Sequence, residues 1–123
     1  MQILLDIDCL IQALKNRIDS TVLNLCRQKL CKGWVVSTSI PVLLAEAGEQ
    51  DVQSLLQDLA VLTPTAHDID QALGSDKPFV KDLAARLVEA SGLDAVVTLT
   101  PDNYSGLKVD ALTPGQLQEK MNA

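Results

Sequence analysis

The sequence predicts an α/β fold, in which a short parallel sheet lies between two layers of helices. Short apolar runs without clean alternation, such as Ile3-Leu4-Leu5 and Ala95-Val96-Val97, recur along the chain. Such runs are typical of strands that are buried on both faces. Segments with helical spacing of apolar residues separate them, and strands that alternate with helices favour a parallel sheet. We therefore expect a three-layer α/β/α architecture.

The first elements follow from apolar runs and cap residues. Residues 2–6 form a short buried strand, and the two acids that follow its apolar run bring it to an end. Asp8 is the expected N-cap of a helix that carries the apolar residues of 10–14. Residues 19–20 supply polar caps for a second helix, and Gly33 is expected to end it.

The remaining elements are assigned from the same signals. Pro41 suits the first turn of a helix, where its missing N–H has no intrahelical partner, and Gly92 suits the end of a long helix. The predicted elements are, in order, a strand over 34–36, helices over 41–46 and 50–58, a strand over 60–63, helices over 65–73 and 78–90, strands over 95–98 and 109–112, and a terminal helix from Thr113-Pro114 onward.

Length and composition indicate one domain over residues 1–123 with an aliphatic core. The chain is 47% hydrophobic but only 2% aromatic, and a domain of this size can fold without disulfides. Its three cysteines lack the spacing of a zinc site and are expected to be free thiols in a reducing compartment. No apolar run approaches the ~20 residues that span a bilayer. We expect a cytoplasmic protein without a membrane partner.

The charge balance restricts how the protein could meet a nucleic acid. The chain carries 10 basic and 16 acidic residues, for a net charge of −6. A nucleic-acid binder usually carries a basic stripe, because neutralised phosphates drive its affinity. Contact with a polyanion would therefore need divalent cations that screen the acids, or a basic surface from a partner or a second copy.

Acidic side chains follow two of the predicted strands. Asp6 and Asp8 come after the first strand, and Asp102 follows the strand that contains Val96. Ligands bind at the carboxyl ends of strands in open α/β sheets, and oxygen ligands suit Mg²⁺ and Mn²⁺. With Glu46 and Asp82, these acids are candidate metal ligands. Two structural alternatives stay open, since Asp8 can be a helix cap and Asp82 a first-turn acid.

The only histidine does not suggest a second kind of catalytic site. His67 lies in the polar run Thr65-Ala66-His67-Asp68, with no second ligand or nucleophile beside it. We expect a solvated position on a helix surface.

Three segments resemble blocks of the PIN domain family. Residues 3–10 resemble its opening strand and acidic turn, with Asp6 in the place of the first catalytic aspartate. Residues 37–46 resemble the block in which a hydroxyl-rich strand end leads into a helix that carries a glutamate, here Glu46. Residues 92–106 resemble the segment that ends the fourth strand and enters an acidic loop. The blocks occur in matching order over nearly the whole chain.

The resemblance implies a fold and an activity. PIN domains are small α/β nucleases that cut RNA with Mg²⁺ or Mn²⁺ held by three or four acids. Many are dimeric toxins that a small antitoxin protein neutralises. By this resemblance, Asp6 and Asp82 would ligate the metal. Glu46 would hold a metal-bound water or orient the nucleophile, and Thr100 would form a hydrogen bond with that water.

Two positions depart from the family pattern and leave two hypotheses open. In strict register from Gly92, the third acidic position falls on Lys81, with Asp82 one residue later, and the fourth falls on Thr100. One residue on a helix is a rotation of ~100°. The chain is either a Mg²⁺- or Mn²⁺-dependent endoribonuclease, or a PIN-like module without nuclease activity that acts through protein contact. If Lys81 points inward, its ammonium would take the place of the metal.

Overall fold

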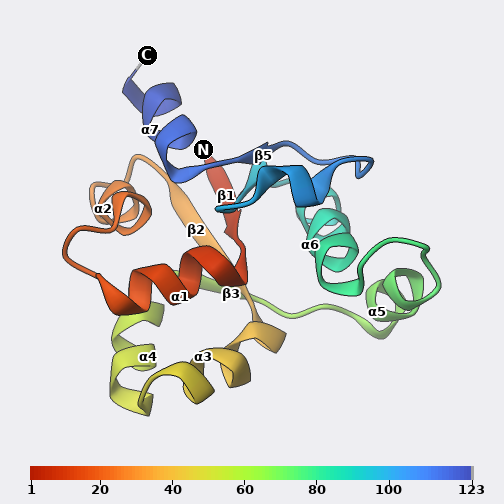
Figure 1. Ribbon diagram of the computed structural model, residues 1–123, viewed down its shortest axis with the longest axis horizontal. Helices are drawn as coiled ribbons and strands as arrows, with labels where there is room; N and C mark the ends of the chain where they lie inside the picture. Colours follow the sequence, from red (N-terminus) through yellow and green to blue (C-terminus); the bar gives the residue numbers. More distant parts are fainter. Residues whose placement is uncertain (123) are drawn as a thin grey trace.

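The computed structural model describes residues 1–122 and consists of a parallel sheet with helices on both faces (Figure 1). The sheet has five strands in the order β3-β2-β1-β4-β5, and every neighbouring pair is parallel. The predicted α/β class and three-layer arrangement are therefore confirmed. The strands are β1 (Gln2–Leu5), β2 (Lys32–Val36), β3 (Ala60–Leu62), β4 (Ala95–Val97) and β5 (Ala111–Leu112).

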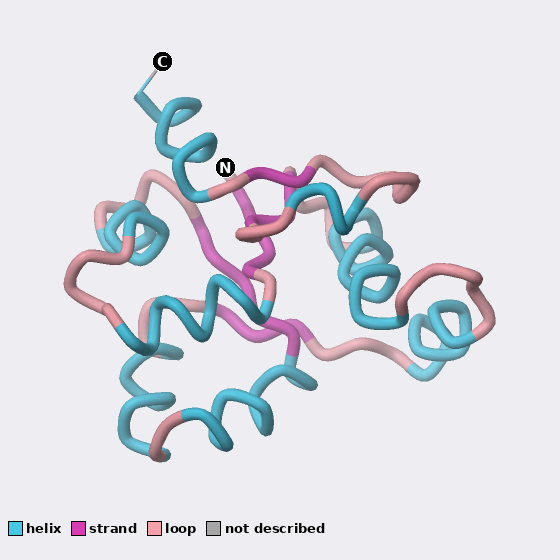
Figure 2. The backbone as a smooth tube through the Cα atoms, viewed as in Figure 1, coloured by secondary structure: helices cyan, strands magenta, loops and turns pink. Residues whose placement is uncertain are grey.

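The helices divide between the two faces of the sheet (Figure 2). One face is covered by α1 (Ile7–Lys15), α2 (Thr21–Arg27), α3 (Ile40–Glu46), α4 (Glu49–Leu56) and α7 (Pro114–Asn122). The other face is covered by α5 (Ala66–Leu73) and α6 (Phe79–Ala90). Two short 3-10 turns, η1 (Ser37–Ser39) and η2 (Pro101–Tyr104), follow β2 and β4.

The central strand β1 supplies side chains to both hydrophobic layers. Ile3 and Leu5 pack into the core beneath α1 to α4, whereas Leu4 packs into the core beneath α6. Successive side chains of a strand point to opposite faces, so an apolar run buries both sides of the sheet at once. This explains why β1 shows no alternation of polar and apolar residues.

Two cap assignments differ from the sequence predictions, and the limits of several strands move by one or two residues. Asp6, and not Asp8, is the N-cap of α1, so the helix begins directly at the end of β1. The second helix ends at Arg27, and Gly33 lies inside β2. A side chain at Gly33 would lie 2.7 Å from the Leu59 side chain, so the glycine permits close packing rather than ending a helix. Gly92 does follow α6, with φ +67, as its predicted role requires.

The strand order creates a switch point beside β1. The chain proceeds from β1 to β2 and β3 on one side, and then returns to add β4 and β5 on the other. The segments that leave β1 and β4 at their carboxyl ends therefore diverge to different parts of the molecule. In open α/β sheets the crevice at such a point is where ligands bind.

Candidate functional site at the carboxyl edge of the sheet

Asp6 lies at the centre of this switch point and is almost completely buried. Its backbone N–H donates to the Val97 carbonyl at 2.9 Å, so it extends the pairing of β1 with β4. One carboxylate oxygen, Oδ1, accepts a hydrogen bond from the Ile7 N–H at 2.9 Å. Only 2% of the side chain is exposed. A buried carboxylate of this kind requires a cation or further donors.

Lys81 of α6 supplies that cation. Its Nζ lies 2.5 Å from Asp6 Oδ2, and 17% of the lysine side chain is exposed. The same ammonium lies 5.2 Å from the centroid of the Tyr104 ring, within the range of a cation–π contact. Lys81 therefore points inward, toward the carboxylate that the sequence assigns to a metal.

Tyr104, the last residue of η2, packs its ring against the Lys81 ammonium. The residue is buried, and its hydroxyl has no hydrogen-bond partner. Burial raises the pKa of Tyr104 well above its ordinary value of 10.0, and the negative charges of nearby Asp6 and Asp8 add to this. The hydroxyl is therefore a neutral group beside two carboxylates, and Asp6 is the carboxylate within its reach.

Asp8 forms the second polar centre of the carboxyl edge. Its Oδ2 accepts hydrogen bonds from Thr98 Oγ1 at 3.0 Å, the Leu99 N–H at 3.1 Å and Thr100 Oγ1 at 3.2 Å. Its Oδ1 accepts the Cys9 N–H at 2.6 Å. Asp8 thus ties the first turn of α1 to the end of β4, and its oxygens are occupied by donors of the chain itself.

Thr100 belongs to this Asp8 network. Its hydroxyl oxygen accepts a hydrogen bond from Asn103 Nδ2 at 3.0 Å in addition to its contact with Asp8. The predicted partner of Thr100 was a metal-bound water beside Asp6. In the structure this hydroxyl instead forms hydrogen bonds with Asp8 and Asn103.

Asp82 and Glu46 do not join Asp6. Asp82 is buried, with 7% of its side chain exposed, and its Oδ2 accepts from Arg86 Nε at 2.8 Å. Glu46 is exposed at the last residue of α3, about 9 Å along the helix axis from its start at 1.5 Å per residue. In Figure 1, α3 leads away from the carboxyl edge.

The structure therefore gives Asp6, Asp82 and Glu46 different surroundings and does not bring them together around one point. Asp6 and Asp82 each have a cation of the chain as partner, and Glu46 faces solvent. Within residues 1–122, no three His, Cys, Asp or Glu side chains gather in a way that could hold a metal ion. The site as folded is neutralised by lysine and arginine.

Sequence reasoning missed Thr98 and Tyr104 and gave Asp8 only a secondary place. Thr98 is fully buried although it is polar. The feature of the sequence that could have identified it is a hydroxyl residue directly after a buried strand. Tyr104 is one of very few aromatic residues in the chain, and it lies in the acidic loop that the family resemblance had already selected. His67, as expected, is exposed on α5.

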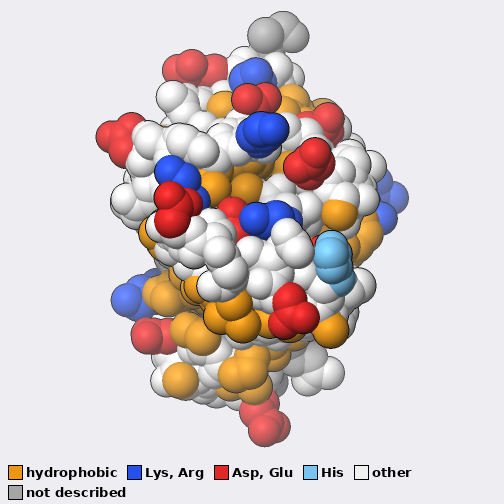
Figure 3. Space-filling view, turned by 90° about the vertical axis from the view of Figure 1, so that its right-hand side faces the viewer, with side chains coloured by type: hydrophobic (Ala, Val, Ile, Leu, Met, Phe, Trp, Pro, Cys, Tyr) orange, Lys and Arg blue, Asp and Glu red, His pale blue; other side chains and the backbone are white. Residues whose placement is uncertain are grey.

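Apolar surface lies next to Asp6. A small pocket of about 40 Å³ is lined by Asp6, by Thr38 and Ser39 of η1, and by Phe79 and Val80 of α6. The last two side chains are 36% and 55% exposed. Hydrophobic side chains gather on the lower half of the face in Figure 3.

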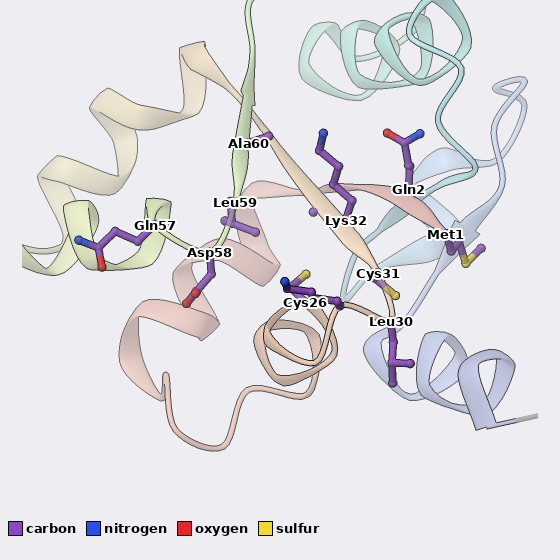
Figure 4. A pocket seen from close by; sticks show the side chains of 12 residues that line it. Met1, Gln2, Cys26, Leu30, Cys31, Lys32, Gln57, Asp58, Leu59 and Ala60 are labelled. Atoms are coloured by element: carbon purple, nitrogen blue, oxygen red, sulfur yellow. The ribbon is translucent and has the colours of Figure 1, made fainter.

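A larger hollow lies at the opposite end of the strands, which we call the amino edge (Figure 4). Its volume is about 560 Å³, and its walls include Cys26, Lys29, Cys31 and Lys32. The three cysteines of the chain are free, as predicted. Burial raises the pKa of Cys26 to about 11, so this thiol is protonated at neutral pH.

Comparison with known families and proteins adds no identification. Neither the family models nor the curated proteins searched contain a match to this chain. Among the helices formed by residues 1–122, none has the length and apolar character to cross a membrane.

Proposed function

We propose that the chain is a PIN-like module that has lost nuclease activity and acts through contact with another protein. The proposal rests on the family resemblance of three sequence blocks and, above all, on the ion pair between Lys81 and Asp6. A productive metal site needs its ligands held within about half an ångström. Here the central carboxylate is held by lysine.

The energetics of the ion pair support this proposal. A divalent cation at Asp6 would have to displace an ammonium that is paired, mostly buried and in contact with the Tyr104 ring. Separating a buried pair leaves an uncompensated charge, which is strongly unfavourable. The nearest other carboxylate of α6, Asp82, would also have to leave Arg86.

Exposed apolar side chains beside Asp6 support the protein-contact part of the proposal. Phe79 and Val80 open α6, and α3, which begins directly after the pocket residues Thr38 and Ser39, carries exposed Val42 and Leu44. Phe79 and Val80 lie together beside the Asp6 pocket, and a contiguous apolar patch of this kind is typical of a protein interface. The partner that the resemblance implies is a second copy of the chain or a small antitoxin-like protein. The free thiols fit a cytoplasmic location.

An RNA cleavage assay tests the loss of activity. Single-stranded and structured RNA are incubated with the protein in Mg²⁺, in Mn²⁺ and in EDTA. We expect no cleavage beyond that of the buffer. EDTA-sensitive cleavage that disappears in Asp6→Asn would overturn the proposal and establish the endoribonuclease.

The endoribonuclease is the second candidate, favoured by the position of Asp6 and Asp8 at the switch point of the sheet. It requires Lys81 to withdraw from Asp6. Isothermal titration of the wild-type protein with Mn²⁺ separates the two candidates. Heat of binding that Asp6→Asn abolishes favours the nuclease, and absence of heat favours the module without activity.

Self-association tests the proposed contact. Sedimentation equilibrium of the wild-type protein should detect a dimer that Val80→Glu weakens, because the substitution places a charge on exposed apolar surface. Lys120→Glu, on the exposed side of α7, is the matched control and should leave the association unchanged. A monomer would remove the second copy as the partner and leave a different protein.

A further inference from the structure

Sulfur-bearing side chains gather at the amino edge. Of the five cysteine and methionine residues of the chain, three line the hollow of about 560 Å³, namely Met1, Cys26 and Cys31. Met1 precedes β1, Cys26 lies in the last turn of α2, and Cys31 directly precedes β2. Figure 4 shows the three side chains around this hollow. The fold therefore brings soft sulfur atoms from three separate places to one wall.

The turn between α2 and β2 brings the two cysteines together. The Leu30 N–H donates to the Leu25 carbonyl at 3.0 Å. The Lys29 N–H donates to the Cys26 carbonyl at 3.0 Å, and Lys29 has the left-handed φ of 60° that this way of ending a helix requires. The chain thus folds back on α2, so that the Cys31 N–H also meets the Leu25 carbonyl, at 3.4 Å. The two thiols are close enough for a charge on Cys31 to act on Cys26.

The first residue of the chain is fixed against this turn. The Lys32 N–H donates to the Met1 carbonyl at 2.9 Å, which places Met1 beside the residue that follows Cys31. The acid in the same hollow, Asp58, is paired with Arg27 at 3.0 Å. The sulfur atoms are therefore the donors of the hollow that no cation of the chain engages.

This donor set selects one class of metal ion. Thiolate and thioether sulfurs bind soft cations, above all monovalent copper, zinc and iron–sulfur clusters. Structural zinc and iron–sulfur clusters take four ligands. No three His, Cys, Asp or Glu side chains of residues 1–122 form such a group. Monovalent copper is satisfied by two or three sulfur atoms, so it is the ion that matches the hollow.

The charges around the hollow suit the same ion. Two thiolates and one monovalent cation form a complex with a single net negative charge. Lys29 and Lys32 line the hollow, and their ammonium groups attract that charge. An acidic protein therefore provides a locally basic wall where a dithiolate complex would lie.

We infer that the amino edge binds one monovalent copper ion between the sulfur atoms of Cys26 and Cys31, with the Met1 thioether as a third donor. As each copper–sulfur bond forms, the proton of that thiol leaves to water, and copper stays monovalent. The hollow lies at the opposite end of the strands from Asp6 and Lys81. The inference is consequently independent of the proposed function, and neither falls with the other.

Competition with a coloured copper chelator tests the inference. The reduced wild-type protein is titrated anaerobically against the Cu(I) complex of bathocuproine disulfonate. We expect the protein to withdraw one copper ion per chain, measured as loss of the absorbance of the complex. Withdrawal of no copper would overturn the inference. Withdrawal of one ion per two chains would overturn it as well, because the ion would then be shared between two copies.

Cysteine variants locate the ion. Cys26→Ser and Cys31→Ser should each lower the affinity for Cu(I) by at least about 100-fold, because loss of even an outer partner of a metal ligand costs about 10–100-fold. Cys9→Ala is the matched control, since it removes the remaining thiol, which is buried in α1, and it should bind copper as the wild-type protein does. If a serine variant keeps its affinity, or if Cys9→Ala loses as much, the inference is wrong.

A spectroscopic measurement on the wild-type protein needs no substitution. X-ray absorption at the copper edge of the loaded protein should show sulfur atoms alone as neighbours of the ion. Nitrogen or oxygen neighbours would place copper at another site and reject the assignment. If a serine variant fails to fold, as judged by far-ultraviolet circular dichroism, this spectrum and the wild-type stoichiometry give the answer.

Discussion

The two ends of the strands differ in how they are filled. At the carboxyl edge, Asp6 and Asp8 are tied to lysine, threonine and backbone donors, and the pocket that Asp6 itself lines measures only about 40 Å³. At the amino edge, a hollow of about 560 Å³ is open beside Lys32 and two free thiols (Figure 4). The larger cavity is therefore not the one with the dense network of polar contacts.

This difference follows from the kinds of segment and side chain that lie at each edge. Loops that leave the carboxyl ends bring charged residues and helix starts, whose unpaired N–H groups need acceptors. Asp6 and Asp8 meet that need, and Lys81 then neutralises the buried carboxylate. At the amino edge the cations are exposed, and Lys32 lies over the Trp34 ring at 4.4 Å. Buried polar groups should consequently dominate stability at one edge only.

Replacing a lysine by methionine at each edge should give the largest difference in the free energy of unfolding. Lys81→Met leaves the buried Asp6 carboxylate without its cation and should lower the free energy of unfolding by roughly 3 kcal/mol, since breaking a buried pair costs about 3–5 and Lys81 retains some exposure. Lys32→Met removes an exposed cation–π contact worth about 0.5–1 kcal/mol. Urea denaturation of the two variants measures both values. Equal losses would show that the carboxyl edge has no special dependence on its lysine.

Removing one of the hydrogen-bond donors to Asp8 should have the next largest effect on stability. Thr98→Val keeps the shape of a fully buried side chain but removes a hydrogen bond to Asp8, and should destabilise the fold by about 1–3 kcal/mol. Thr100→Val is the matched control, because that hydroxyl is exposed, and should change stability by less than half as much. Thermal denaturation by circular dichroism compares them. A reversed order would contradict the importance of burial for this network.

A substitution at the amino edge should stabilise the protein slightly. Lys29 is the one non-glycine residue of positions 1–122 with positive φ, at 60°. The left-handed conformation costs a side-chain-bearing residue about 1–2 kcal/mol, and glycine avoids most of that cost while its unfolded state gains entropy. Lys29→Gly should therefore raise the free energy of unfolding by at most about 1 kcal/mol. Lys29→Ala, which keeps the strain, should show no gain in the same urea titration.

The reactivity of Cys26 at the amino edge should depend on pH, and its raised pKa should make the stability of the fold depend on pH only above neutral pH. Because the pKa of Cys26 is about 11 in the folded protein against an ordinary 9.0, its alkylation by iodoacetamide should be slow at neutral pH and accelerate steadily toward pH 11. The raised pKa favours the folded state below pH 9, and this contribution declines as pH rises from 9 to about 11, because the unfolded thiol ionises first. Mass spectrometry locates the label, and Cys26→Ala should show a weaker decline of stability over that range.

Much of the element order was predictable because local signals agree with the tertiary arrangement. The apolar runs at Ile3 and Val96, the cap Ser20 and the proline at position 41 all appear in the predicted elements. The misassigned cap at Asp8 shows the limit of such signals. Asp6 and Asp8 are chemically equivalent acids, and only the pairing of the Asp6 backbone with Val97 decides which of them opens α1.

The candidate site was less predictable for the same reason. The sequence identified Asp6 and Lys81 as positions of interest, but it could not state that the lysine faces the aspartate 75 residues earlier. The pair of Asp82 with Arg86 is by contrast a local i, i+4 contact that helix spacing permits. The rotation of ~100° between neighbouring helix positions sends Lys81 and Asp82 to different partners. Thr98 was missed because its role exists only when β4 lies beside the start of α1.

Apolar periodicity and cap residues act over a few positions, so they were enough to establish the class of the fold, the order of most of its elements and the residues at the carboxyl ends of the central strands. Which charges meet depends on how distant segments pack together. The distance between Lys81 and Asp6 depends on where α6 packs against β1, and the choice between a metal and a lysine as the counterion of a buried carboxylate follows from that packing.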